Sequence, residues 1–136
     1  MERALIDTGA LLALVIAKDQ YHRRAVETYA GFRARGGHFI GTPLVLSEFH
    51  NLVRARLPIA SAGKLLGALL HDRIYGWQDL PADALQRAQA EWIDRYPDQG
   101  FSLADAVSFE LMRSHRISKA FSFDRHFVTA GFSLLD

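Results

Sequence analysis

The sequence contains no cysteine, no long apolar run and little net charge, and each absence excludes a class of protein. Without cysteine among 136 residues, disulfides, thiolate catalysis and cysteine-ligated zinc are excluded, and a reducing cytosol fits. No stretch approaches the roughly 20 apolar residues that cross a bilayer. The apolar run after Met1 contains Arg3 and Asp7 and lacks a basic leader, so it is a poor signal peptide. We therefore expect a cytoplasmic protein that has no membrane segment.

The composition that remains is typical of a globular protein. Hydrophobic residues make up 49% of the chain and charged residues 23%, and the length suits one domain spanning residues 1–136. The net charge of +1 gives no global electrostatic reason to bind nucleic acid, although basic residues gather locally. These clusters fit either solvated helix faces or contacts to phosphate; they are HRRA (22–25), RAR (33–35 and 54–56), RSHRISK (113–119) and DRH (124–126).

Short apolar segments alternate with helix-like segments along the whole chain. Strands are expected at 2–6, 38–41, 73–80, 119–123 and 132–135, and helices at 9–17, 20–35, 42–57, 60–71, 81–96 and 101–115. Thr42-Pro43 is a strong helix start, because a capping hydroxyl precedes a proline at the first helical position. The alternation predicts an α/β layer fold with a short, mainly parallel five-stranded sheet. In such sheets, ligands bind beyond the carboxyl ends of the strands.

Four carboxylates stand where such a site is expected. Asp7 and Asp124 directly follow predicted strands, so both should lie at the carboxyl edge of the sheet. Glu48 and Asp105 lie on helices near their starts. At helical spacing their neighbours are apolar, so we expect both acids on buried faces.

Each acid also has a purely structural interpretation. Asp7 and Asp124 could cap the segments that follow them, Asp105 completes a capping-box pattern with Ser102, and Glu48 could pair with an arginine. Together, however, four clustered carboxylates would repel one another by about 1–4 kcal/mol per close pair. Such a cluster persists if cations neutralise it or if some protons remain. Oxygen ligands alone favour hard ions, Mg²⁺ or Mn²⁺.

Four motifs in a fixed order connect these acids to a known family. LIDTGALLAL (5–14), TPLVLSEFHNLV (42–53), FSLADAVSFELM (101–112) and AFSFDRHF (120–127) follow one another along the chain. In this the chain resembles the PIN-domain ribonucleases, and among them the VapC-type toxins of toxin–antitoxin pairs. The resemblance covers essentially the whole chain and implies a three-layer α/β/α PIN-like domain. Gly9 departs from it, since the family often has serine or threonine there.

The resemblance also implies an activity and a set of site residues. It assigns Asp7, Glu48, Asp105 and Asp124 as catalytic residues that ligate one or two Mg²⁺ or Mn²⁺ ions, with Thr8 and Ser102 in supporting positions. The implied function is a metal-dependent endoribonuclease that attacks RNA phosphodiesters with metal-activated water and leaves 5′-phosphate and 3′-hydroxyl ends. The implied partners are an RNA substrate, a cognate antitoxin protein and a second copy of the chain in a homodimer.

Other polar residues leave alternatives open. Arg125 and His126 follow Asp124 directly and could contact RNA, but surface residence is an equal alternative. The histidines are scattered and show no metal-ligand spacing, which disfavours a zinc hydrolase. The second hypothesis for function is a PIN-like module that binds RNA or protein without cutting it. The intact set of four acids argues against this module, because a protein that does not cut has no evident need for clustered charge.

Overall fold

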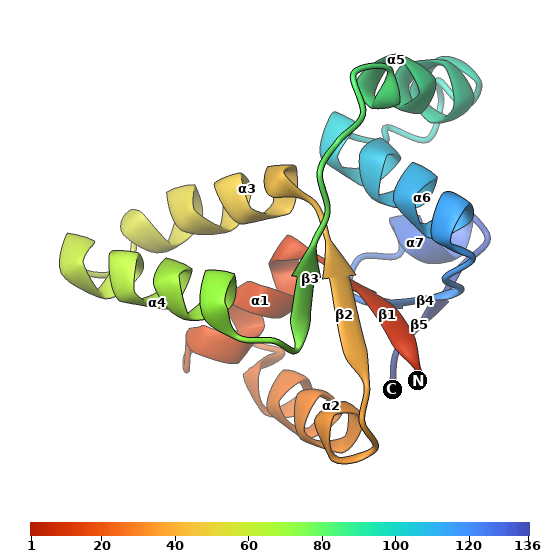
Figure 1. Ribbon diagram of the computed structural model, residues 1–136. Coiled ribbons are helices and arrows are strands. Elements are labelled where there is room, and N and C mark those ends of the chain that lie inside the picture. Colours follow the sequence, from red (N-terminus) through yellow and green to blue (C-terminus); the bar gives the residue numbers. More distant parts are fainter.

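The computed structural model describes all 136 residues, which form one five-stranded sheet with helices on both faces (Figure 1). Every pair of neighbouring strands is parallel, in the order β3-β2-β1-β4-β5. The strands are β1 (Arg3–Ile6), β2 (His38–Gly41), β3 (Tyr75–Trp77), β4 (Lys119–Phe121) and β5 (Ser133–Leu134). The predicted α/β fold with a five-stranded, mainly parallel sheet is confirmed.

The helices connect the strands in alternation. They are α1 (Thr8–Val15), α2 (His22–Ala34), α3 (Pro43–Arg54), α4 (Ile59–His71), α5 (Ala84–Ala88), the π-helix η1 (Gln89–Asp94), α6 (Leu103–His115) and α7 (His126–Thr129). None of them is long and apolar enough to span a membrane. The predicted helix at 81–96 is present in two parts, and the four-residue α7 was not predicted.

The predicted strand at 73–80 is much shorter in the structure. β3 is an edge strand that pairs only with β2, and the last register partners are Gly41 and Trp77. Since β2 ends at Gly41 and the chain turns there into α3, residues beyond Trp77 have no strand with which to continue the ladder.

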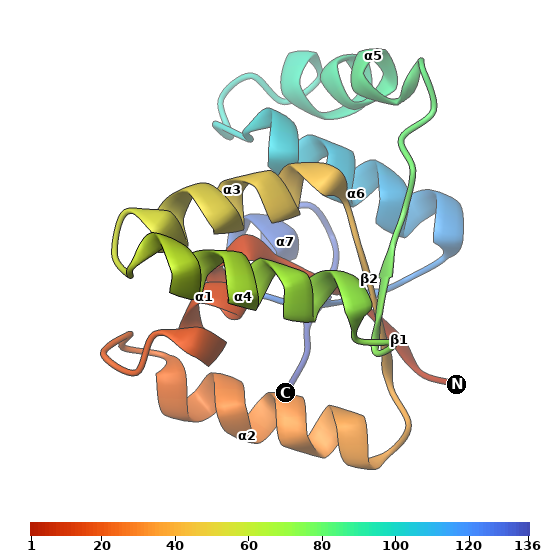
Figure 2. The ribbon, with the colours of Figure 1, turned by 60° about the vertical axis from the view of Figure 1, so that its left-hand side comes forward.

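Alternate residues of the strands supply two separate cores. Ala4 and Ile6 of β1 pack on one face with residues of α1, α2, α3 and α4. Leu5 packs on the other face with residues of α5, η1, α6 and α7. Figures 1 and 2 show α3 and α4 side by side on the first face, with α2 also on that side. The layers are therefore α/β/α, as expected for strands buried on both faces.

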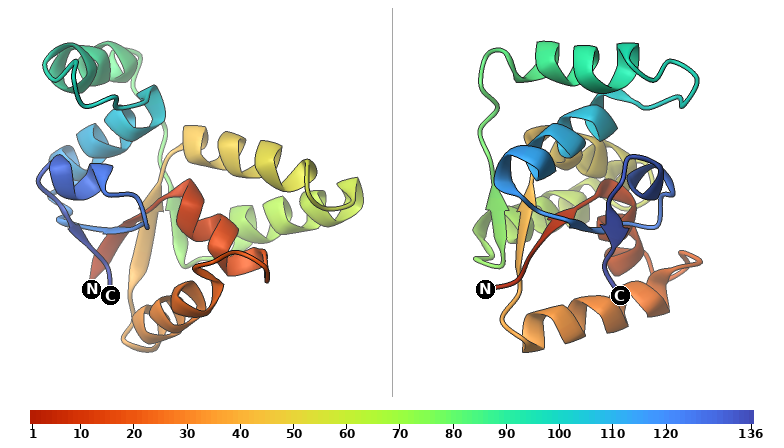
Figure 3. Two further views of the ribbon diagram at one scale, coloured as in Figure 1. Left: turned by 180° about the vertical axis from the view of Figure 1, so that it is seen from behind. Right: turned by 90° about the vertical axis from the view of Figure 1, so that its right-hand side faces the viewer.

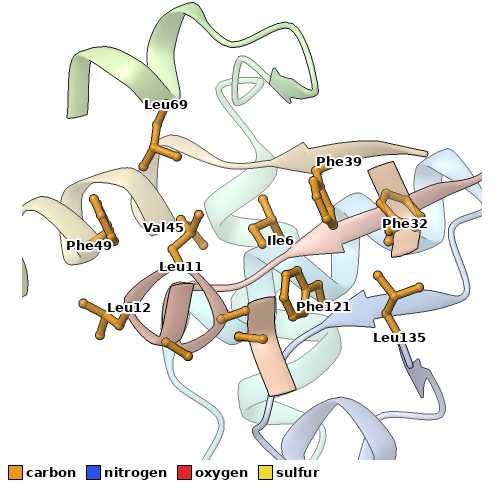
Figure 4. Close-up of a cluster of buried hydrophobic side chains, with 14 of the residues drawn as sticks. Ile6, Leu11, Leu12, Phe32, Phe39, Val45, Phe49, Leu69, Phe121 and Leu135 are labelled. Atoms are coloured by element: carbon orange, nitrogen blue, oxygen red, sulfur yellow. The ribbon is translucent and has the colours of Figure 1, made fainter. Parts of the chain in front are cut away.

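Phe39 of β2 is the centre of the aromatic packing on the first face. Its ring is fully buried and lies 4.6 Å from Phe32 and 5.6 Å from both Tyr75 and Phe121, measured between ring centroids. Figure 4 shows Phe39 and Phe121 beside Ile6, on three adjacent strands. This packing ties β1, β2, β3 and β4 together, so that the ends of β1, β2 and β4 come to one edge.

Candidate active site

Three helices begin at the carboxyl edge of the sheet, and local sequence fixes where they start. The Thr42 hydroxyl accepts the backbone N–H of Val45 at 3.3 Å and Pro43 opens α3. Ser102 caps α6, while α1 begins directly after Asp7 at the end of β1. Figure 3 (left) shows α1, α3 and α6 starting at the same end of the strands. Side chains in the first two turns of these helices therefore come close to one another at this edge.

An open groove of about 830 Å³ lies between these three helices at the carboxyl edge of the sheet. All eight residues predicted for the site line this groove: Asp7, Thr8, Glu48, Ser102, Asp105, Asp124, Arg125 and His126. Its other lining residues come from α1, the loop before α2, the last turns of α3 and the segment after it, and the loops before α6 and α7. The structure thus brings the whole predicted set together at one edge of the sheet.

Asp7 lies deepest among the four acids. It follows β1, is half-buried, and accepts a hydrogen bond from the Ser122 hydroxyl at 2.8 Å. Its side chain makes no helix-capping hydrogen bond to α1, so the capping interpretation does not account for it. Burial raises the pKa of Asp7 to about 7; the Ser122 hydrogen bond opposes this, and the nearby charges of Asp105 and Asp124 add to it.

Asp105, Asp124 and His126 form a tight cluster beside Asp7. Their ligand atoms lie within 4.8 Å of one another. His126 Nδ1 is 3.0 Å from Asp105 Oδ2 and 3.6 Å from Asp124 Oδ2, so the imidazole lies between the two carboxylates. The side chain of Asp105 is 14% exposed and that of Asp124 is 45% exposed.

Asp105 and Asp124 also make the capping hydrogen bonds that the sequence predicts for them. The Ser102 hydroxyl accepts the Asp105 N–H at 3.0 Å, and Asp105 Oδ2 accepts the Ser102 N–H at 3.2 Å, which is a capping box. Asp124 Oδ1 accepts the backbone N–H of His126 at 2.9 Å and so satisfies the start of α7. Because each acid still directs Oδ2 towards His126, capping and membership of the cluster are compatible.

The predicted burial of Glu48 is wrong. Glu48 was expected on a buried face of α3, yet it is exposed. The buried stripe of α3 is Val45, Phe49 and Val53, which packs in the core shared with α1 and α4, and Glu48 lies about 100° away from Phe49 around the helix. Glu48 makes no ion pair or hydrogen bond, so the arginine pairing considered for it is absent, and its carboxylate is open to the groove.

The hydroxyl groups of Thr8 and Ser102 differ in whether they make a hydrogen bond. Ser102 is committed to capping α6. The Thr8 hydroxyl is buried at the groove and has no hydrogen-bond partner, an arrangement that is uncommon for a buried oxygen. A ligand in the groove would supply that partner.

Sequence reasoning missed several residues of this site. Ser122 is buried, donates to Asp7, and accepts the Asp124 N–H at 3.0 Å, so it joins the two strand-end acids. A polar residue directly after a buried strand was the available signal. Tyr21 and Arg56 also line the groove. Arg56 belongs to the basic cluster RAR (54–56), but no sequence pattern placed that cluster or Tyr21 at this edge of the sheet.

The residues present fit a hard divalent cation. Asp105 and Asp124 offer carboxylate oxygens within reach of one another, Asp7 adds a third that is costly to ionise alone, and Glu48 is unpaired across the groove. Oxygen donors in this number suit Mg²⁺ or Mn²⁺. A cation would also favour the ionised form of Asp7, whose pKa is raised chiefly by burial and further by the nearby charges of Asp105 and Asp124.

Known proteins resemble this chain over nearly its whole length. No family model matches the chain. It is 29% identical over 127 residues to the 23S rRNA-specific endonuclease VapC20 of Mycobacterium tuberculosis, from two strains, covering 93% of both proteins. The crystal structure of M. tuberculosis VapC20, described as a Sarcin-Ricin loop cleaving toxin, superposes with a TM-score of 0.84 and 28% identity over 95% of both chains.

A more distant structure shares the fold. PAE2754 from Pyrobaculum aerophilum aligns with a TM-score of 0.60 and 19% identity, covering 99% of this chain and 90% of that one. The parallel sheet with its two helical layers gives this chain a PIN-like fold. More narrowly, the predicted resemblance to the VapC-type proteins is confirmed, since it extends over nearly the whole of both chains.

Proposed function

We propose that this chain is an endoribonuclease, the toxin of a type II toxin–antitoxin pair, and that residues 1–136 form one nuclease domain. The observation that carries the proposal is the convergence of four carboxylates on one groove at the carboxyl edge of the sheet. Because VapC20 is described as specific for 23S rRNA and as cleaving the Sarcin-Ricin loop, a ribosomal RNA loop is the first substrate to examine. A nuclease with this target would act in the cytoplasm.

We propose that Asp7, Asp105 and Asp124 hold one or two Mg²⁺ or Mn²⁺ ions, with Glu48 completing the set. A cation bound there would activate a water molecule and neutralise charge on the phosphodiester. Ser122 orients the Asp7 carboxylate through its hydrogen bond. Glu48, exposed and unpaired, is available to take a proton from the attacking water.

The proposed roles of Arg125 and His126 concern the substrate. Arg125 is exposed, makes no ion pair and lines the groove, so its guanidinium is available to a phosphate. His126 lies between two carboxylates, so its imidazole is held at the acidic cluster, where a substrate phosphate would approach. The resemblance to VapC-type toxins supports two further proposals: an antitoxin that blocks the groove, and a homodimer.

The test is cleavage of RNA by the purified protein. Total cellular RNA and a short hairpin with the Sarcin-Ricin loop sequence would be incubated with Mg²⁺, Mn²⁺ or EDTA. Asp105→Asn is the site variant, and Asp79→Asn, an exposed acid outside the groove, is its matched control. We expect discrete fragments with 5′-phosphate ends that require the ion, disappear with Asp105→Asn and persist with Asp79→Asn.

Two results would contradict the proposal. Cleavage that is unchanged in EDTA would remove the role of the ion. Binding of RNA by the folded protein without any cleavage would instead support the non-cutting module.

A further inference from the structure

Two aromatic rings from distant parts of the chain stack at the wall of the groove. The rings of Tyr21 and Phe123 have centroids 4.5 Å apart and planes only 5° from parallel. Phe123 directly precedes Asp124, and Tyr21 lies in the loop just before α2. Both side chains line the groove that contains the four acids. The stack therefore stands one residue away from a proposed metal ligand.

The Tyr21 ring is fixed in place but still accessible. Phe123 covers one of its faces, and the Tyr21 backbone N–H donates to Asp19 Oδ1 at 2.8 Å. The residue is nevertheless 37% exposed, and its hydroxyl makes no hydrogen bond within the protein. A rigid aromatic ring that is open to a groove offers a flat surface at little entropic cost to a ligand.

Two cationic side chains also line this otherwise acidic groove. Arg56 lies just after α3 and is exposed, and its guanidinium makes no ion pair or hydrogen bond. It and Arg125 are the two arginines that line the groove, whose other charged or titratable residues are Asp7, Asp19, Glu48, Asp105, Asp124 and His126. Two unpaired guanidinium groups in one groove with these acids can bind phosphates of a chain that must approach the carboxylates.

We propose that Tyr21, supported from behind by Phe123, is a base-binding subsite of the groove. It stacks against one unpaired nucleobase of RNA next to the bond that is cut, and Arg56 binds a phosphate beside that base. Single-stranded RNA is generally held by stacking of unpaired bases on aromatic side chains together with cationic contacts to the backbone. The inference rests on the proposed function only for the identity of the ligand as RNA.

A purely structural role explains less of this arrangement. If the stack only anchored the loop before α2, a buried aliphatic side chain would serve equally well, and the ring would not need to line the groove. The chain also offers a matched control. Tyr96 is 38% exposed and packs near Trp92, but it lines a different cavity.

The experiment measures RNA binding separately from cleavage. A fluorescent hairpin with the Sarcin-Ricin loop sequence is titrated in EDTA, followed by anisotropy, with 2-aminopurine at successive loop positions to report stacking. Tyr21→Leu should raise the dissociation constant about 5- to 150-fold, the range expected for loss of one stacked base. Tyr21→Phe should bind within about twofold of the wild type, because the ring is kept. Tyr96→Leu should have no effect.

Arg56 is tested by salt dependence. Arg56→Gln should reduce the slope of log affinity against log salt by about 0.7, the value for one phosphate contact on a single strand. Arg73→Gln, an exposed arginine outside the groove, should leave the slope unchanged. Circular dichroism and urea midpoints establish that each variant is folded.

The outcomes separate this inference from the proposed function. Unchanged RNA affinity and unchanged 2-aminopurine quenching in folded Tyr21→Leu would overturn it, and would leave the exposed ring to a protein partner. Absence of hairpin binding by the wild type would also overturn it. RNA that is bound through Tyr21 but is not cut with Mg²⁺ or Mn²⁺ would refute the nuclease while supporting the subsite.

Discussion

Asp7→Asn should stabilise the metal-free protein at alkaline pH. Burial raises the pKa of Asp7 from 3.8 to about 7, so the folded state binds this proton more tightly than the unfolded chain does. Stability contributed by the protonated acid is therefore lost as the pH rises from about 4 to about 7. Asparagine has no charge to bury, and its amide oxygen can still accept the Ser122 hydroxyl.

The size of the effect follows from the same pKa. A rise from 3.8 to about 7 corresponds to about 4 kcal/mol at pH 8. Because Asp7 is only half-buried, we halve this figure and expect the variant to be about 2 kcal/mol more stable at pH 8. Near pH 4 the two proteins should differ little. A bound divalent cation should reverse the order, since it stabilises the folded wild type by about 2.7 kcal/mol at 100 times its dissociation constant.

The assay is urea unfolding followed by fluorescence of Trp77 and Trp92, at pH 4.5 and pH 8, in EDTA and in Mn²⁺. Asp79→Asn is the control, and its difference from the wild type should not depend on pH or on Mn²⁺. A folded Asp7→Asn that is less stable than the wild type at pH 8 in EDTA would refute the reasoning. Equal stabilisation of both proteins by Mn²⁺ would refute the assignment of Asp7 as a ligand.

Three other substitutions test the packing and the support of the site. Ser122→Ala removes the donor to Asp7, so Mn²⁺ affinity measured by calorimetry should fall about 10-fold or more; unchanged affinity would mean that Ser122 does not orient the ligand. Phe39→Ala empties the centre of the aromatic core and should cost about 3–5 kcal/mol in urea unfolding. Arg116 ends α6 at φ 56°, so Arg116→Gly should stabilise by about 0.5–1 kcal/mol, and a loss of stability would contradict this.

The fold was predictable because the signals for strands and for helix starts both lie in short stretches of sequence. Apolar runs marked each strand, and Thr42-Pro43 and Ser102 marked two helix starts that the structure places where expected. The length of the strand at 73–80 was not predictable, because it depends on where the neighbouring β2 ends. The helix α7 has only four residues, which is too short for a periodic signal.

The site was partly predictable for the same reason. Asp7 and Asp124 were found because they follow strands, and a parallel sheet brings strand ends together. Contacts between distant segments carried no such signal: Ser122 meets Asp7 across 115 positions, and Tyr21 meets Phe123 from another loop. The exposure of Glu48 was misjudged because helical spacing identifies its neighbours on α3 but not whether another element covers them.

Sulfur substitution at the bond that is cut tests most directly whether an ion held by these acids acts on the phosphodiester. Once the cut is mapped, a short RNA would carry sulfur in place of one non-bridging oxygen of that phosphate, as separated diastereomers. We predict that one diastereomer is cleaved far more slowly than the oxygen substrate in Mg²⁺ and that Mn²⁺ restores its rate, because Mn²⁺ accepts sulfur as a ligand more readily. Cleavage of both diastereomers at the rate of the oxygen substrate in Mg²⁺, or a defect that Mn²⁺ does not relieve, would contradict this account.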